Sequence, residues 1–291
     1  MLANLFIRLS YNRKMKVTGN TKLIGFLGSS YKTSKMYEMY NAAFAELNLD
    51  YQYVPLIVDD LKKAIDGVKN LGMKALGVTM PYKIDIIPYL DELDENAQRI
   101  GAVNVVVNKD GKLIGGNTDG IGALRALEEK IEVKNKKVVL LGAGGAARAI
   151  VFVLTDNNAN LTILNRDIKK AEELAKEVNV SYGNYEDLEK ELKDADILIN
   201  TTSVGMVDTD TEGQSLVDPE LLRPELVVME LISKPKETKL VIDAKNKGCE
   251  IVYGYRMLLW QGVEKFKMYT DKEPPVEVME KALLSLRGMT G

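Results

Sequence analysis

The sequence contains no histidine, and its 291 residues include a single cysteine, Cys249. One cysteine cannot form an internal disulfide. The Cys/His zinc site that one class of alcohol dehydrogenases uses is excluded because its ligands are missing, and we expect no metal. The absence of histidine also removes the side chain that most often carries protons in enzymes. Acid–base chemistry in this chain would therefore depend on another residue type.

Long apolar runs and a strong excess of charge are missing as well. No apolar run approaches the roughly 20 residues that span a bilayer, and the formal net charge is only −3. This balance favours neither nucleic acid nor a membrane as a partner. The opening segment is a poor targeting signal because Arg8 interrupts a short apolar part. We expect a cytoplasmic protein in a reducing compartment, either a monomer or a homodimer.

Short apolar segments alternate with helical patterns along the chain, which is typical of an α/β protein built from parallel βαβ units. Strands are predicted at 22–28, 51–58, 74–79, 137–141, 161–164, 196–199 and 226–229. A hairpin is predicted over 103–116, with its turn at Asp110-Gly111. A helix over 60–72 would place five apolar side chains on one buried face: Leu61, Ala64, Ile65, Val68 and Leu71.

The pattern predicts two domains, which the length of the chain allows. The segment NTDG (117–120) separates the two series of strands, so we place a boundary near residue 119. The helical stretches from about 256 follow a nucleotide fold that is already complete, and we expect them to pack on the first domain. Residues 1–119 with 256–291 would then form one domain, and 120–255 the other.

The segment VVLLGAGGAARA (138–149) fits the phosphate-binding pattern G-x-G-x-x-G/A through Gly142, Gly144 and Ala147. The first glycine allows a tight turn, the second lets the backbone approach a pyrophosphate, and the small third residue allows close helix–strand packing. The motif follows a strand and opens a helix, which is the context that it requires. It therefore predicts a dinucleotide cofactor.

The end of the next strand indicates which dinucleotide is used. An NAD site usually carries a carboxylate there, whereas this chain has Asn165 followed by Arg166. A guanidinium can bind a ribose 2′-phosphate in a bidentate manner, so NADP is favoured. Asp167 leaves NAD, or use of both, as the alternative.

Two sequence patterns could supply the proton carrier in place of histidine. Tyr31 and Lys35 match a Tyr-x-x-x-Lys pattern, but the pair precedes the nucleotide loop by more than a hundred residues, and we reject it. Lys83 in TMPYK and Asp119 in NTDG each follow a predicted strand, where sites of open α/β sheets form. Lys83 could protonate a carbonyl oxygen, and Asp119 could position its ammonium group. Two solvated surface charges are the alternative.

Several segments occur in the order and approximate spacing of the shikimate dehydrogenase family. They are TMPYK, IGAVNVVVNKDGKLIGGNTDGIGALRAL, LLGAGGAARAI, LNR, NTTSVGM and GYRMLLWQGVEKF. The resemblance implies an N-terminal αβ substrate domain and a C-terminal Rossmann-type domain across a cleft. It also implies the reversible NADP-dependent reduction of 3-dehydroshikimate to shikimate, a step in aromatic amino acid biosynthesis.

The resemblance assigns roles to individual positions. The catalytic positions are Lys83 and Asp119; the substrate positions are Thr33, Ser34, Thr79, Asn104 and Gln261; the cofactor positions are Gly142, Ala143, Gly144, Gly145, Ala146, Asn165, Arg166, Thr201, Thr202 and Gly254.

The chain also departs from the family. The usual His-Ser-x-Ser-Pro is replaced by GSSYKTSKMYEMYN, and Glu230 and Ser233 stand where the family has Asp and Tyr. A quinate/shikimate-type dehydrogenase, using NAD or acting on another ring polyol carboxylate, is therefore the alternative enzyme. A module that binds nucleotide without catalysis is the alternative from another class.

Overall fold

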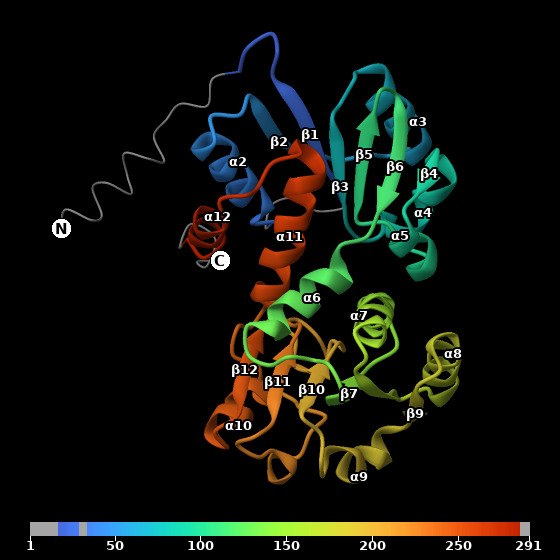
Figure 1. The fold of residues 1–291 in the computed structure, drawn as a ribbon, viewed down its shortest axis with the longest axis vertical. Helices are drawn as coiled ribbons and strands as arrows, with labels where there is room; N and C mark the ends of the chain where they lie inside the picture. Colours follow the sequence, from blue (N-terminus) through green and yellow to red (C-terminus); the bar gives the residue numbers. More distant parts are fainter. Residues whose placement is uncertain (1–16, 29–33, 286–291) are drawn as a thin grey trace, which may run out of the picture. The chain divides into compact units, whose positions relative to one another are not determined.

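The computed structural model describes residues 17–28 and 34–285 of the chain, and their contacts divide them into two units. The first unit comprises the described residues up to Thr118 and those from Gly262 onward, and the second is Asp119–Gln261. Each unit contains one six-stranded sheet (Figure 1). The predicted α/β class is confirmed.

The sheet of the first unit is mixed, with the strand order β2-β1-β3-β5-β6-β4. Strand β1 pairs in parallel with β2 and β3, and β5 pairs antiparallel with β3 and β6. The strands are β1 (Lys22–Leu27), β2 (Tyr51–Leu56), β3 (Ala75–Val78), β4 (Glu92–Leu93), β5 (Val105–Lys109) and β6 (Lys112–Gly116). The predicted hairpin is confirmed, because Asp110 and Gly111 join β5 to β6 with φ angles of 52° and 89°.

Helices cover this sheet, and their apolar faces largely follow the sequence pattern. They are α2 (Met36–Glu46), α3 (Leu61–Asn70), α4 (Tyr82–Asp85), α5 (Glu95–Ile100) and α12 (Val276–Leu283), with the 3₁₀ turn η1 (Ile87–Tyr89). The prediction that Leu71 is buried was wrong, since its side chain is 78% exposed. Helix α3 ends at Asn70, and Gly72 with a φ of 61° turns the chain away, so Leu71 leaves the buried stripe.

The second unit has an all-parallel sheet with the order β12-β11-β10-β7-β8-β9. This is the doubly wound, Rossmann-type order. The strands are β7 (Lys137–Leu141), β8 (Asn160–Leu164), β9 (Ser181–Gly183), β10 (Ile197–Asn200), β11 (Val227–Glu230) and β12 (Glu250–Tyr253). The helices are α6 (Asp119–Glu128), α7 (Gly145–Asp156), α8 (Ile168–Val178), α9 (Leu188–Leu192), α10 (Lys239–Asn246) and α11 (Gly254–Thr270), with the 3₁₀ turns η2 (Tyr185–Asp187) and η3 (Pro219–Leu221).

Both faces of this parallel sheet are buried, which explains why its strands read as continuous apolar runs. Alternate residues of β7 pack into different clusters: Val138 and Leu140 contact the cluster that includes α6, α7 and α8. Val139 and Leu141 belong to the cluster that includes α9 and α10. Helix α11 begins in this unit, and its residues from Gly262 on are counted in the first. No helix of the described residues is long and apolar enough to cross a membrane.

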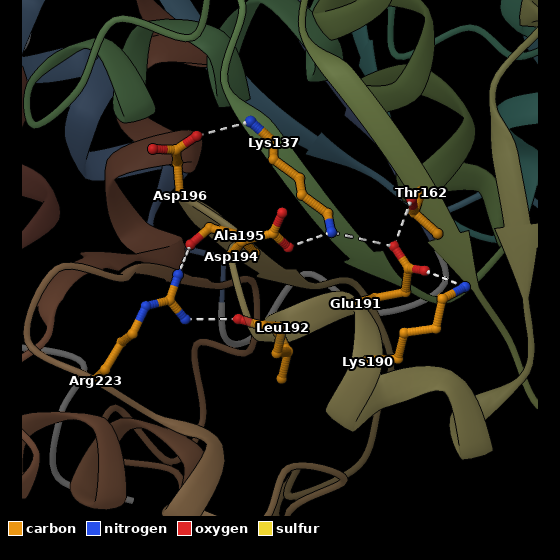
Figure 2. Close-up of polar contacts among 9 residues, drawn as sticks. All are labelled: Lys137, Thr162, Lys190, Glu191, Leu192, Asp194, Ala195, Asp196 and Arg223. Atoms are coloured by element: carbon orange, nitrogen blue, oxygen red, sulfur yellow. Dashed lines mark hydrogen bonds and ion pairs between the residues drawn. The ribbon is translucent and has the colours of Figure 1, made fainter.

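A polar network closes the amino-terminal end of β7 and β10 (Figure 2). We call Lys137, Glu191, Asp194, Asp196 and Arg223 the basal charge cluster. The ammonium group of Lys137 pairs with Asp194 and lies 3.5 Å from Glu191. The backbone N–H of Lys137 donates to the carboxylate of Asp196 at 2.8 Å. The guanidinium of Arg223 donates to the carbonyl oxygens of Leu192 and Ala195. The cluster fastens the segment around α9 to the sheet.

Candidate functional site

The turn between β7 and α7 has the geometry of a phosphate-binding loop. Gly142 has a φ of 107°, and a Cβ atom there would lie 2.5 Å from Thr201 Oγ1, so only glycine fits without displacement. Its N–H donates to the carbonyl oxygen of Leu164 at 2.8 Å. Gly144 and Gly145 are exposed and have no atom within 4 Å of a Cβ position. The glycines therefore leave the backbone open at the start of a helix.

Helix α7 presents its amino terminus at this opening. Gly144 is the N-cap residue, and no side chain caps the helix. The first N–H groups of a helix have no partner within it, and the helix dipole favours an anion there. Ala147 is completely buried and Ala143 and Ala146 are half-buried, so small side chains seat α7 against the sheet. The turn can hold a pyrophosphate without further residues.

The segment after β8 leaves one charge available to a ligand. Asp167 is the N-cap residue of α8, and its carboxylate accepts the N–H of Lys169 at 3.1 Å. Asn165 Nδ2 donates to the carbonyl oxygen of Asp167 at 2.9 Å. Arg166 is exposed. Burial raises the pKa of nearby Tyr185, and a hydrogen bond with the Arg166 backbone, followed by the charge of its guanidinium, opposes that rise. Asp167 therefore already has a structural role as the cap of α8, which favours NADP over NAD.

Two threonines follow β10, the strand next to β7. Thr201 Oγ1 donates to the carbonyl oxygen of Leu141 at 2.6 Å, which places this hydroxyl against Gly142. Thr202 donates to Asn200 Oδ1 twice, from its N–H at 3.0 Å and from its hydroxyl at 2.7 Å. These residues line the carboxyl ends of two adjacent strands, where the strand order reverses and ligands bind in open α/β sheets.

Gly254 opens helix α11 directly after β12. A Cβ atom at this position would lie 2.5 Å from the carbonyl oxygen of Leu231 and 3.0 Å from that of Glu230. The close approach needs glycine, and it holds the start of α11 against the loop that follows β11. The fold thus gathers Gly142, Thr201, Thr202 and Gly254 at one edge of the second sheet.

The first unit places Thr79 and Lys83 just beyond the carboxyl end of β3. Thr79 is half-buried, its N–H donates to the carbonyl oxygen of Leu27 at 3.0 Å, and its own carbonyl oxygen accepts the N–H of Tyr82 at 3.0 Å. Lys83 lies in the short helix α4 and is also half-buried. The N–H of Val103 donates to the Lys83 carbonyl oxygen at 2.7 Å, which holds α4 beside the residues preceding β5.

Asn104 is completely buried and is paired with Thr118. Asn104 Oδ1 accepts the N–H of Thr118 at 3.0 Å, and Asn104 Nδ2 lies 3.2 Å from its hydroxyl. This pairing fixes the backbone immediately before Asp119, which is the first residue of α6 in the second unit and is 5% exposed. A carboxylate at that position is favoured by the helix dipole.

The remaining predicted substrate residues lie on α11 and before α2. Gln261 is half-buried, and a Cβ atom at Gly122 would lie 2.7 Å from its backbone nitrogen, so α6 and α11 cross closely there. Ser34 is half-buried, and its hydroxyl accepts the N–H of Met36 at 3.3 Å. Thr33 and Tyr31 lie outside the described residues.

Sequence reasoning did not single out Asn200, and it noted Glu230 only as a departure from a family pattern. The structure joins them, because Asn200 Nδ2 donates to both carboxylate oxygens of Glu230 at 3.0 and 3.1 Å. The available signal was that each polar residue ends an otherwise apolar strand, in ILIN and VVME.

Family models match most of the chain. The model for the shikimate dehydrogenase substrate binding domain matches residues 26–106, that for shikimate/quinate 5-dehydrogenase matches 125–241, and that for the shikimate 5′-dehydrogenase C-terminal domain matches 254–284.

Individual proteins are similar over nearly their whole length. A shikimate dehydrogenase (NADP(+)) of Methanocaldococcus jannaschii is 45% identical over 278 residues, covering 92% of this chain and 98% of the relative. A crystal structure of a shikimate dehydrogenase in complex with NADP+ superposes with a TM-score of 0.86 at 44% identity, covering 92% of this chain and 96% of that one. The shikimate 5-dehydrogenase of Listeria monocytogenes, in complex with shikimate and NAD, also gives 0.86, at 37% identity and with 92% and 98% coverage.

Proposed function

The chain belongs to the shikimate dehydrogenase family, and from this premise we propose that it catalyses the reversible NADP-linked reduction of 3-dehydroshikimate to shikimate. The main support for this proposal is the open glycine turn at the start of α7, together with the exposed Arg166 after the next strand. A pyrophosphate and a ribose 2′-phosphate are the anions that such a pair of features accepts.

The second unit, Asp119–Gln261, would hold the cofactor. Residues Gly142 to Ala146 would receive the pyrophosphate on backbone N–H groups, and Asn165 with Arg166 would bind the adenosine phosphate. Thr201, Thr202 and Gly254 would border the nicotinamide, which supplies or accepts the hydride when bound. The glycines fit this use because open space surrounds Gly144 and Gly145.

The proposed proton carrier and most of the proposed substrate residues belong to the first unit, whereas Asp119 and Gln261 are the end residues of the second. Lys83 would donate a proton to the carbonyl oxygen as hydride arrives, and recover one in the reverse direction. Asp119 would position and balance its ammonium group. Thr79, Asn104 and Gln261, with Ser34 or Thr33, would bind the hydroxyls and carboxylate of the substrate, since hydroxyl and amide groups provide both donors and acceptors.

The proposed function also implies which partner, compartment and oligomeric state to expect. We expect a small ring polyol carboxylate as the partner, and neither nucleic acid nor a membrane. We expect the protein to work in the cytoplasm as a monomer or homodimer.

The test is a spectroscopic assay with four substrate–cofactor combinations. The purified protein receives shikimate or quinate with NADP+ or NAD+, and absorbance at the reduced nicotinamide band is followed. The highest kcat/KM is expected for shikimate with NADP+. Higher kcat/KM for quinate would favour the quinate/shikimate-type alternative. Binding of NADP+ without turnover of either acid would favour a module that only binds nucleotide.

A further inference from the structure

The carboxylate of Glu230 is completely buried at the end of β11. Burial raises its pKa, and hydrogen bonds from Ile232, Asn200 and Thr238 oppose that rise. Within the described residues Glu230 has no cationic partner. A buried carboxylate is costly unless hydrogen-bond donors surround it, so the donors around Glu230 must be held in place.

Four hydrogen bonds meet this requirement. Oε1 accepts the N–H of Ile232 at 3.0 Å, and Oε2 accepts the hydroxyl of Thr238 at 3.0 Å. Asn200 Nδ2 donates to both oxygens. Thr238 is in turn the N-cap residue of α10, where its side chain accepts the N–H of Val241. One carboxylate thus joins the ends of β10 and β11 to the start of α10.

The negative charge also decides which way the Asn200 amide faces. Only its NH₂ group can donate to a carboxylate, so its Oδ1 must face the opposite side. There it accepts the N–H and the hydroxyl of Thr202, and Thr202 Oγ1 accepts the N–H of Val204 at 3.2 Å. Every donor and acceptor along this path has one possible direction.

We propose that Glu230 is a positioning residue for the cofactor: acting through Asn200, it holds Thr202 and the loop after β10 in the conformation that receives the nicotinamide end. This inference rests on the proposed function, which puts the nicotinamide beside Thr201 and Thr202. Glu230 itself does not touch the cofactor, since Asn200 lies between it and Thr202.

The Glu230→Gln substitution tests the charge at nearly constant shape. One acceptor oxygen becomes an NH₂ group that faces Asn200 Nδ2, so two donors oppose each other. Turning the Asn200 amide relieves that conflict but points its NH₂ group at the N–H of Thr202. We expect the dissociation constant of NADP, measured by calorimetric titration, to rise on the order of 10-fold. The KM for shikimate should change much less.

Exchanging the carboxylate and the amide between positions 230 and 200 should restore the NADP binding that Glu230→Gln weakens. Asn200→Asp alone places two carboxylates against each other and should weaken NADP binding more than Glu230→Gln does. When both substitutions are combined, the carboxylate now on β10 can accept from Thr202 and from the amide NH₂ group now on β11, and the remaining amide oxygen can accept the N–H of Ile232. The conflict between positions 200 and 230 is then removed, provided that the hydroxyl of Thr238 turns to accept instead of donating. We expect the double variant to bind NADP within about 3-fold of the wild type, a strongly non-additive result. Glu230→Asp keeps the charge, and it should bind NADP more tightly than Glu230→Gln does.

Glu191→Gln is the matched control. Glu191 is also a mostly buried carboxylate of the second unit, with its side chain 14% exposed, but it lies in the basal charge cluster (Figure 2). This variant should lower the melting temperature and leave NADP binding unchanged.

Two results would overturn the proposal. One is a Glu230→Gln protein with a lowered melting temperature but wild-type NADP affinity, and the other is a double variant whose loss equals the sum of the single losses. A wild-type protein that binds NADP but does not oxidise shikimate would contradict the proposed function instead, because the NADP measurements stand without turnover.

Discussion

A single lysine carries the proposed chemistry in a chain that has no histidine. Lys83 is half-buried and follows β3 by one turn, and its backbone carbonyl is fixed by Val103. Its position is therefore set by the fold and not by a flexible loop. This is the arrangement expected of a general acid, which must reach its substrate atom in a defined geometry.

Lys83→Ala should lower kcat by roughly 10²–10⁴, the range typical of a lost general acid or base, with a smaller effect on KM. Steady-state kinetics with shikimate and NADP+ measure both. Lys62→Ala is the control, since Lys62 is exposed and its ammonium group pairs with Asp66 on the surface of α3. Near wild-type turnover of Lys83→Ala would remove Lys83 from the mechanism.

Arg166→Ala should weaken NADP by about 1.5–3 kcal/mol, the value of hydrogen bonds to charged groups, and leave NAD little changed. The reason is that only NADP carries the 2′-phosphate, and Asp167 is engaged in capping α8. Titration of both nucleotides measures the difference. Lys176 lies in α8 and pairs with Glu172, so Lys176→Ala should change the affinity for neither nucleotide. Equal losses for both nucleotides would show that Arg166 does not read the phosphate.

Elements decide how these residues are presented, and the glycine turn before α7 shows this best. Gly142 and Gly144 belong to one motif but serve different needs. The first has a positive φ and no room for a side chain, whereas the second has a φ of −87° and open space around it. Glycine at position 142 is therefore required for the fold itself, whereas glycine at position 144 leaves room for the ligand to approach the backbone.

Their alanine variants should separate accordingly. Gly142→Ala should destabilise the protein by about 1–3 kcal/mol, through backbone strain and crowding of Thr201, and weaken NADP. Gly144→Ala should leave the melting temperature unchanged or slightly raised, because alanine tolerates that backbone conformation, yet weaken NADP. Thermal unfolding and nucleotide titration measure the two effects. Intact NADP affinity in Gly144→Ala would show that the backbone there is not approached by the pyrophosphate.

The basal charge cluster should control acid stability in the second unit. Burial acts to raise the pKa of Glu191, but Lys190, Lys137 and Thr162 outweigh it and the pKa is lowered. The hydrogen bond from Lys137 lowers the pKa of Asp194. A lowered folded-state pKa contributes stability that is present above the unfolded value and lost as pH falls through the folded value.

Lys137→Met should therefore lower the melting temperature at pH 7. Its difference from the wild type should shrink as pH falls from the unfolded-state values of the two carboxyls, about 4, through their lower folded-state pKa values. Melting curves between pH 7 and 3 follow the difference. Lys62→Met, which removes an exposed pair, should show little change at any pH. A pH-independent difference for Lys137→Met would mean that lost packing, not charge, causes it.

At the scale of the whole molecule, the chain divides into a unit proposed to hold substrate and a unit proposed to hold cofactor. A ligand that binds only the folded protein stabilises it by mass action. Each ligand should then protect the unit to which it binds.

NADP at 100 times its dissociation constant should add about 2.7 kcal/mol and raise the melting temperature. In hydrogen exchange, protection should concentrate in the second unit, at the start of α7, after β8 and after β10. Shikimate alone should instead protect the segments after β3 and before α6. Protection by NADP that is confined to the first unit would contradict the assignment of the two units.

Local sequence patterns were enough to predict the features that depend on neighbouring residues. Four strands of the second sheet, β7, β8, β10 and β11, were predicted within about one residue. Buried parallel strands are uninterrupted apolar runs bounded by polar residues, which makes them easy to find. The hairpin turn at Asp110-Gly111 and the glycine turn at Gly142 were predicted because each needs a backbone conformation that few residues adopt. Strands β4 and β9, with 2 and 3 residues, escaped prediction because they are too short to show a period.

Contacts between residues that are distant in the sequence became known from the three-dimensional fold. Sequence marks Asn200 and Glu230 as polar residues that end apolar strands, but their pairing depends on β10 and β11 being neighbours in register. The same holds for Asn104 with Thr118, and for Gly254 against Leu231. These contacts arise from strand order and helix crossing, which long-range packing selects, so the alternation of residue types along the chain cannot specify them.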